Sequence, residues 1–234
     1  MATKKSKIDK FYDTLNMVVL EEEITLYREY IQFMENHLTD ETEKYQKLGI
    51  RLRKKRHERH KQEYKQVDLT EPPSPEIALA DTQEQKIATV YASILRMSFF
   101  VSLYSFLEAY LIEECRYREH WGRTSIPLED VIHGGIDKAK ECLKVDKQKD
   151  KDCLKNQIDF GGNEWRKIKE LQELRNFVVH SGNSFDNAKE NKKEILEQIV
   201  EKEQTLSRSG DGILFRRGFC EKALIAIEDF INLT

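Results

Sequence analysis

Apolar residues recur at three- and four-residue steps along most of the chain, which is the spacing of amphipathic helices. Residues 8 to about 36 predict one such helix, with this apolar stripe: Ile8, Phe11, Leu15, Val18, Val19, Leu26, Tyr30 and Phe33. Thr39 and Asp40 are residue types that cap helices, so we expect a second helix from there to about residue 66. Together the two helices predict an N-terminal helical hairpin.

The segment VDLTEPPSPE, residues 67–76, holds three of the four prolines of the chain. Proline fixes its own backbone torsion and lacks an amide hydrogen, so this segment predicts a stiff, extended linker. We therefore expect two units, a helical extension at residues 1–70 and a domain at residues 76–234.

Helices also dominate the pattern after the linker. A long helix from residue 76 to about 119 contains the most hydrophobic segment, SFFVSLYSFLEAYLIEEC, which we expect to lie in the core. Gly210 and Gly212 mark a turn that fits a short β-hairpin within residues 204–214. Shorter helices are expected over these ranges: 127–133, 163–181, 187–202 and 215–232. The fold class is therefore all-α, a helical bundle.

Composition narrows the class of protein without naming a function. Charged residues make up 35% of the chain and hydrophobic residues 39%, which is typical of a folded protein with a charged surface. No apolar run approaches the roughly 20 residues of a membrane span, and the N-terminus lacks the pattern of a secretory signal. We expect a cytoplasmic protein without a membrane partner. A net charge of -3 gives no reason to expect that the protein as a whole attracts nucleic acid.

No Cys-x-x-Cys spacing occurs among the four cysteines: Cys115, Cys142, Cys153 and Cys220. We interpret them as reduced, buried thiols in a reducing compartment. The alternative is a zinc site that joins two of them to His120 or His133, although no metal-ligand spacing favours it. We expect neither a metal nor a cofactor.

Candidate chemistry lies in the segment LRNFVVH, where Arg175 and His180 enclose four residues. At about 100° per residue, Arg175 falls inside the apolar arc of its helix, whereas Asn176 and His180 lie together at the edge of that arc. A guanidinium placed there needs an anionic partner. The spacing alone is weak, because a slightly looser version fits two pairs in a highly charged part of the chain: Arg51/His57 and Arg53/His60.

Glu108 is the candidate partner, because it lies on the apolar face of the most hydrophobic helix. Two opposite charges, each misplaced on an apolar stripe, predict one buried ion pair between Glu108 and Arg175. Such a pair either orients an active-site arginine or only fixes the register of two helices. The residues themselves leave both interpretations open.

Residues 76–234 resemble a HEPN domain. The resemblance rests on Ser105-x-x-Glu108 in a hydrophobic helix, on the lead-in GGNEW to a helix carrying ELRNFVVHSGN, and on the closing amphipathic helix FRRGFCEKALIAIEDFINL. In that family the Arg…His pair is the RNA-cleaving motif and is often completed at a dimer interface. Residues 1–70 are not part of the family pattern.

The resemblance implies motif roles for Arg175, Asn176 and His180, with Ser105 and Glu108 in support. Cleavage without a metal suits these residue types, because RNA carries its own nucleophile in the 2′-hydroxyl. His180 can move protons near neutral pH, and Arg175 can stabilise the charge that develops on the phosphorane. The expected products are a 2′,3′-cyclic phosphate and a 5′-hydroxyl.

A basic run, RLRKKRHERHKQEYK at residues 51–65, holds eight Lys or Arg against two Glu. It is either a helix that binds RNA phosphates or a solvated helix face. On the first interpretation, the RNA-binding residues are Arg51, Arg53, Lys54, Lys55, Arg56, Arg59 and Lys61.

The leading hypothesis is an endoribonuclease of HEPN type that works as a homodimer. The resemblance further implies a toxin or defence effector, restrained by an inhibitory or regulatory partner protein. One alternative is a non-catalytic HEPN-like module that binds a partner protein or a nucleotide, and another is a helical interaction protein that works through its N-terminal hairpin. Exposure separates the first two, because a nuclease needs His180 open to a cationic cleft.

Overall fold

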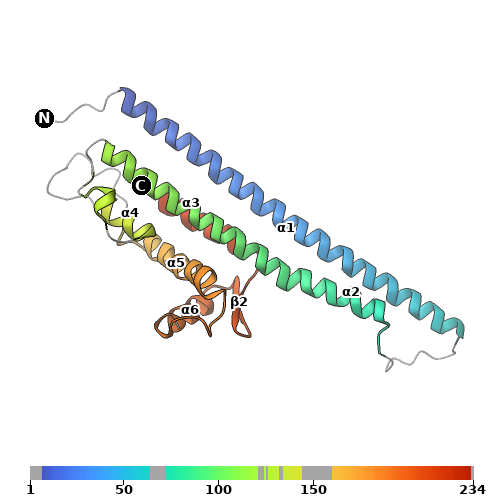
Figure 1. Cartoon of the computed structure of the whole chain (residues 1–234). Helices are drawn as coiled ribbons and strands as arrows, with labels where there is room; N and C mark the ends of the chain where they lie inside the picture. Colours follow the sequence, from blue (N-terminus) through green and yellow to red (C-terminus); the bar gives the residue numbers. More distant parts are fainter. Residues whose placement is uncertain are drawn as a thin grey trace.

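The computed structural model describes residues 7–63, 72–120, 124, 126–131, 134–143 and 160–232, with the backbone alone at 7–17 and 60–63. The described chain is helical apart from its loops and one small β-hairpin (Figure 1), which confirms the all-α class. Its elements are α1 (Lys7–Glu63), α2 (Pro75–Gln85), the π-helical η1 (Lys86–Tyr91), α3 (Ala92–His120), the 3-10 turn η2 (Leu128–Asp130), α4 (Gly135–Leu143), α5 (Asn163–Ser181), α6 (Glu190–Lys202), β1 (Leu206–Ser209), β2 (Gly212–Phe215) and α7 (Phe219–Asn232).

α1 is one continuous helix, so the prediction of a helical hairpin within residues 1–70 is wrong. Thr39 does not cap a helix. Its hydroxyl donates to the Glu35 carbonyl oxygen 2.8 Å away, and the Thr42 hydroxyl donates to the Leu38 carbonyl oxygen in the same way. Because these hydroxyls are satisfied one turn back in their own helix, and no proline intervenes, the helix continues through the expected break.

The hairpin instead pairs α1 with the helices that follow the linker. α2 begins at Pro75, which suits a proline because the first helical position needs no amide donor. α2, η1 and α3 continue as one long helix that lies antiparallel along α1, and the ends of α1 and α2 project beyond the other elements (Figure 1). We call this projecting pair, residues 41–63 of α1 together with α2, the arm. The predicted extended linker covered residues 67–76. Residues 67–71 lie outside the described residues, and the last two residues of the linker, Pro75 and Glu76, belong to α2.

Packing buries a different face of α1 from the predicted one. The predicted stripe is turned outward, with 46–68% exposure at Val18, Val19, Leu26, Tyr30 and Phe33, while the side chains of Ile8, Phe11 and Leu15 lie outside the described residues. The buried residues are Ile24, Ile31, Met34 and Leu38, and they share one core with α3 and α7. Both sets have helical spacing, so periodicity alone could not choose between them.

α3 is the central helix, as its hydrophobic sequence predicted. Phe100, Leu103, Leu107 and Leu111 are completely buried. The long helix Pro75–His120 is apolar enough to cross a membrane by length and composition, but core helices of soluble proteins pass the same test, and this one packs against α1, α5 and α7. The helix itself therefore indicates a core position rather than a location in the cell.

The remaining elements pack around α3. α4 and α5 lie on the side of α3 away from α1, and α7 contacts α1, α3 and α5 (Figure 1). The short β-hairpin is confirmed, with Leu206 opposite Phe215, and its Phe215 amide donates to the Ser93 hydroxyl of α3. α4 was not predicted, and residues 127–133 hold only the turn η2 among the residues that the structure describes there.

A buried ion pair joins three of these elements. Arg96 of α3 donates from Nε and Nη2 to the two carboxylate oxygens of Glu35 in α1, both at 2.6 Å. Its Nη1 donates to the Phe215 carbonyl oxygen of β2 at 3.2 Å. Both side chains are less than a tenth exposed. This pair fixes α1 and the hairpin against α3, and the sequence analysis did not find it.

Candidate active site

α5 presents the Arg-x4-His motif beside α3, much as the helix geometry predicted. Ile168, Leu171 and Leu174 are buried against the core, and Arg175 lies at the border of that buried face. α5 is held from both sides by ion pairs. Lys169 donates to the Asp137 carboxylate of α4 at 3.0 Å, and Glu173 accepts from the Lys192 ammonium of α6 at 2.6 Å.

The predicted partner of Arg175 is confirmed, but the pair is less buried than expected. Arg175 Nη2 lies 3.5 Å from Glu108 Oε2, and the two side chains are 22% and 23% exposed. Arg175 Nη1 also donates to Asn176 Oδ1 at 3.1 Å. The guanidinium is therefore held between a carboxylate of α3 and an amide of its own helix while one edge stays open to solvent.

Glu108 is itself positioned by the start of α4. A Cβ added to Gly135 would lie 2.7 Å from Glu108 Oε1, so a larger residue there would push the carboxylate away from its present position. Gly135 also has a φ of 61°, which glycine adopts at little cost. The carboxylate thus lies at the N-terminus of α4, where the helix dipole favours negative charge.

Tyr104 lies below this ion pair and is fully buried. Burial raises the pKa of its hydroxyl far above the usual range, and the nearby charge of Glu108 raises it further, against a lowering effect of Arg175. The hydroxyl has no hydrogen-bond partner among the described residues, and the same holds for Arg175 Nε. Tyr104 therefore stays protonated and forms the floor of the site.

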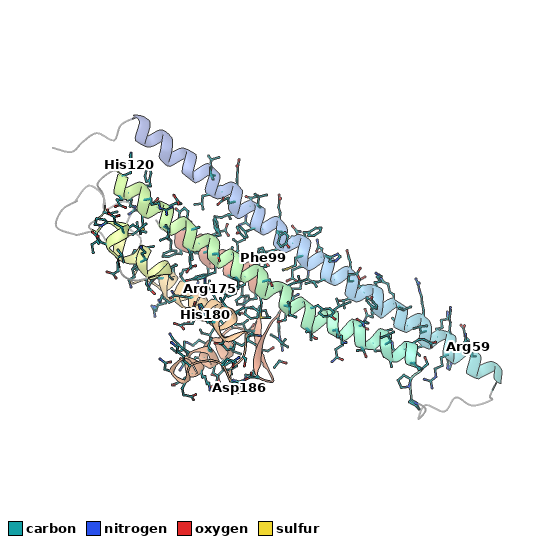
Figure 2. The ribbon with its side chains drawn as sticks, viewed as in Figure 1. Arg59, Phe99, His120, Arg175, His180 and Asp186 are labelled. Carbon is teal, nitrogen blue, oxygen red and sulfur yellow. The ribbon has the colours of Figure 1, made fainter. Side chains whose placement is uncertain are left out.

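His180 is exposed, near Arg175 at the end of α5 that faces the hairpin (Figure 2). Five residues of α-helix separate the two side chains by about 140° around the axis and about 7.5 Å along it. Asn176 lies one turn before His180, on the same side of the helix. One chain therefore presents the imidazole and the guanidinium in different directions, with Asn176 between them.

The residues after His180 fix the end of the motif helix. Gly182 takes the left-handed conformation that ends α5, with a φ of 62°, and Asn183 follows with a φ of 58°. The Asn183 side chain then pairs with Ile213 of β2 in both directions: Nδ2 donates to its carbonyl oxygen at 3.0 Å, and Oδ1 accepts from its amide at 3.2 Å. The Asn183–Ile213 contact fixes the end of the helix that carries His180 against the hairpin. The only sequence signal for it is an asparagine directly after the glycine that ends the helix.

Ser105 does not join Arg175. Its side chain is exposed, and its hydroxyl donates to the Val101 carbonyl oxygen of its own helix at 2.9 Å. It belongs to a stripe along the long helix whose members are all exposed and are spaced four and three residues apart: Tyr91, Leu95, Ser98, Ser102, Ser105 and Ala109. We call these residues the outer stripe.

Two shallow apolar grooves flank the outer stripe, and Ser98 lines both. The groove toward α1 has a volume of about 500 Å³ and is lined by Leu26, Tyr30 and Leu95 among others. The groove toward α5 has a volume of about 450 Å³ and includes Val178 of the motif helix. Exposed apolar side chains of α1 and of the motif helix thus lie on the two sides of the outer stripe, and apolar grooves of this kind occur at interaction sites.

The basic run lies at the far end of the molecule, on the arm (Figure 2). The described side chains of the run are exposed or half-exposed: Arg51, Arg53, Lys54, Lys55, Arg56 and Arg59. The side chain of Lys61 lies outside the described residues. Arg53 forms an ion pair with Asp81 of α2. The predicted RNA-binding residues and the motif residues therefore form two separate sites.

The described cysteines belong to the core. Cys115, Cys142 and Cys220 are buried free thiols, and burial raises the pKa of Cys220 to about 12. Among the residues that the structure describes, no three His, Cys, Asp or Glu side chains gather where they could hold a metal ion. Cys153 and His133 lie outside the described residues.

Comparison of the chain with protein-family models, curated proteins and solved structures finds no match. The likeness to HEPN domains stays a resemblance of motifs.

Proposed function

We propose that the chain is a metal-independent endoribonuclease of HEPN type, with Arg175 and His180 as its catalytic residues. The observation that carries the proposal is the contrast between these two side chains. Arg175 is held by Glu108 and Asn176, as a residue that stabilises charge must be, while His180 is exposed, as a residue that exchanges protons with a substrate must be.

The chemistry follows from these positions. His180 removes the proton of the 2′-hydroxyl, whose oxygen attacks the adjacent phosphorus, and the bond to the 5′-oxygen of the next nucleotide breaks. The leaving oxygen takes up a proton, which leaves a 2′,3′-cyclic phosphate and a 5′-hydroxyl. Arg175 stabilises the negative charge on the phosphorane. The amide of Asn176 lies between the two groups and can hold a phosphate oxygen.

We also propose that the active unit is a homodimer formed through the outer stripe. Its spacing of four and three residues is that of a seam between two helices, and its small side chains, such as Ser98 and Ser102, allow a second helix to approach closely. A second copy would bring another His180 to the same face. One imidazole could then act as base and the other as acid, whereas one chain supplies a single motif histidine.

The cleavage assay uses purified protein, total RNA and EDTA. We expect wild-type protein to cut RNA and His180→Ala, purified identically, to be inactive with an unchanged melting temperature. His120→Ala, which removes another exposed histidine, should keep full activity and so controls for a contaminating nuclease. Products should accept a 5′-phosphate from polynucleotide kinase without prior phosphatase treatment. Equal cleavage by wild type and His180→Ala would refute the catalytic assignment.

The assembly assay measures mass in solution by light scattering. Ser102→Arg places a charge in the middle of the outer stripe and should convert a dimer into a monomer with reduced cleavage. Ser209→Arg makes the same exchange at an exposed position of the hairpin and should leave both properties unchanged. A wild-type monomer that cleaves RNA would show that one chain suffices.

The competing function is a non-catalytic helical module, and the observation that favours it is the Arg175–Glu108 ion pair. An Arg175–Glu108 contact fixes the register of α5 against α3 whether or not chemistry occurs there. The two functions differ in the role of His180, which no described hydrogen bond requires for the fold. The EDTA assay therefore decides between them.

A further inference from the structure

The outer side of the arm carries cations that its own acidic residues do not neutralise. Gly49 is buried against Asp81 of α2, so it marks the side of α1 that faces α2. At about 100° per residue, Arg51, Lys54 and Lys55 lie about 140–240° around the helix from Gly49 and point away from α2. No ion pair involves these three side chains within the part of the chain that the structure describes.

In the two preceding turns of α1, the cations on the same side have acidic partners. Lys44 pairs with Glu41 at 3.3 Å, and Lys47 pairs with Glu43 at 2.8 Å. That stretch is therefore close to neutral, and the unneutralised charge begins at Arg51. The charge of this side of α1 therefore changes from near neutral to positive at Arg51. We call Arg51, Lys54 and Lys55 the arm tip.

The tip is remote from the candidate active site. Arg53 lies beside Asp81, and Arg175 lies beside Glu108, so the two sites are separated by the stretch of continuous helix between residues 81 and 108. This stretch of 108 − 81 = 27 residues spans about 40 Å at a rise of about 1.5 Å per residue. Figure 2 shows Arg59 near the end of the arm, well away from Arg175 and His180, which lie beside the middle of the long helices.

We propose that the arm tip is a second binding site for the RNA backbone, which anchors long RNA at a distance from the point of cleavage. RNA as the ligand rests on the proposed function. The described residues Arg51, Lys54 and Lys55 offer point charges, which suit phosphates and not a particular base. A stacked strand, at about 3.4 Å per phosphate, needs about 12 nucleotides to reach from one site to the other. A strand of about 5 nucleotides is too short to reach both sites, even when it is extended.

The test measures binding separately from cleavage, with 2′-O-methyl RNA that lacks the nucleophile and cannot be cut. Homopolymeric uridine strands of about 5 and about 24 nucleotides, below and above the spanning length, are titrated by fluorescence anisotropy at several salt concentrations. The test variant is Lys54→Gln/Lys55→Gln. The matched control is Lys44→Gln/Lys47→Gln, which removes the same charge from the same side of α1.

For the long strand, we expect the test variant to lower the slope of log affinity against log salt by about 1.4, since each lost phosphate contact on a single strand contributes about 0.7. The control should keep the wild-type slope. The difference should be smaller with the short strand, which cannot occupy both sites at once. Equal slopes for wild type and test variant, or equal losses in test variant and control, would overturn the anchor.

The experiments distinguish a wrong assignment of the RNA anchor from a wrong assignment of the nuclease activity. Cleavage of the short, unmodified strand in EDTA depends on the candidate active site alone, so loss of the anchor leaves it intact. Conversely, salt-dependent binding of the uncleavable long strand persists if no cleavage is found at all.

Discussion

Arg96→Ala is expected to destabilise the protein far more than Arg175→Ala, although both substitutions break an Arg–Glu pair on α3. Arg96 makes two 2.6 Å hydrogen bonds to Glu35 and one to Phe215, and its loss leaves a carboxylate less than a tenth exposed without a partner. Removing one member of a buried pair costs about 3–5 kcal/mol. For a chain of this size, that corresponds to a fall in melting temperature of roughly 6–20 °C.

The Arg175 pair has a single 3.5 Å contact and is more than a fifth exposed, so solvent screens it. Its loss, with that of the hydrogen bond to Asn176, should cost about 1–2 kcal/mol. Urea unfolding followed by far-ultraviolet circular dichroism measures both variants, with Arg28→Ala, which breaks a more exposed pair between α1 and α7, as a control below about 1 kcal/mol. Equal losses for Arg96→Ala and Arg175→Ala would refute this reasoning from burial.

Two further substitutions test the floor of the candidate site. Gly135→Ala should cost at least about 1 kcal/mol and lower RNA cleavage, because a methyl group there displaces the Glu108 carboxylate and the left-handed backbone strains any other residue. Gly134→Ala, whose added methyl group meets nothing within 4 Å, is the matched control for the same urea and cleavage assays, and an equal effect of both would refute the clash. Tyr104→Phe should leave the free energy of unfolding unchanged or raise it, because a buried hydroxyl without a partner costs about 1–3 kcal/mol. A loss above about 1 kcal/mol in that variant would mean that the hydroxyl has a partner in solution.

Local pattern predicted the long core helix, the motif helix, α6 and α7, because their signals are local. The hydrophobic segment around Leu107 forms the core, and Gly182 ends the motif helix, whereas α4 was missed and residues 127–133 hold only the turn η2 among the described residues there. α1 shows where such signals mislead. Thr39 is a residue type that often caps helices, but its hydroxyl is equally satisfied inside a continuous helix. The surrounding packing decides whether the helix starts at this residue or continues through it.

The sequence by itself determined the all-α class and the identity of Glu108 as the partner of Arg175, while it placed Arg175 inside the apolar arc and the structure places it at the border. Each follows from residue type and helical period, which act within a single helix. The tertiary structure alone decided which of two apolar stripes of α1 is buried, and that Arg96 and Glu35 form the more deeply buried pair. It also decided that the motif and the basic run lie about 40 Å apart, because that distance depends on how long helices lie against one another, and no residue records it locally.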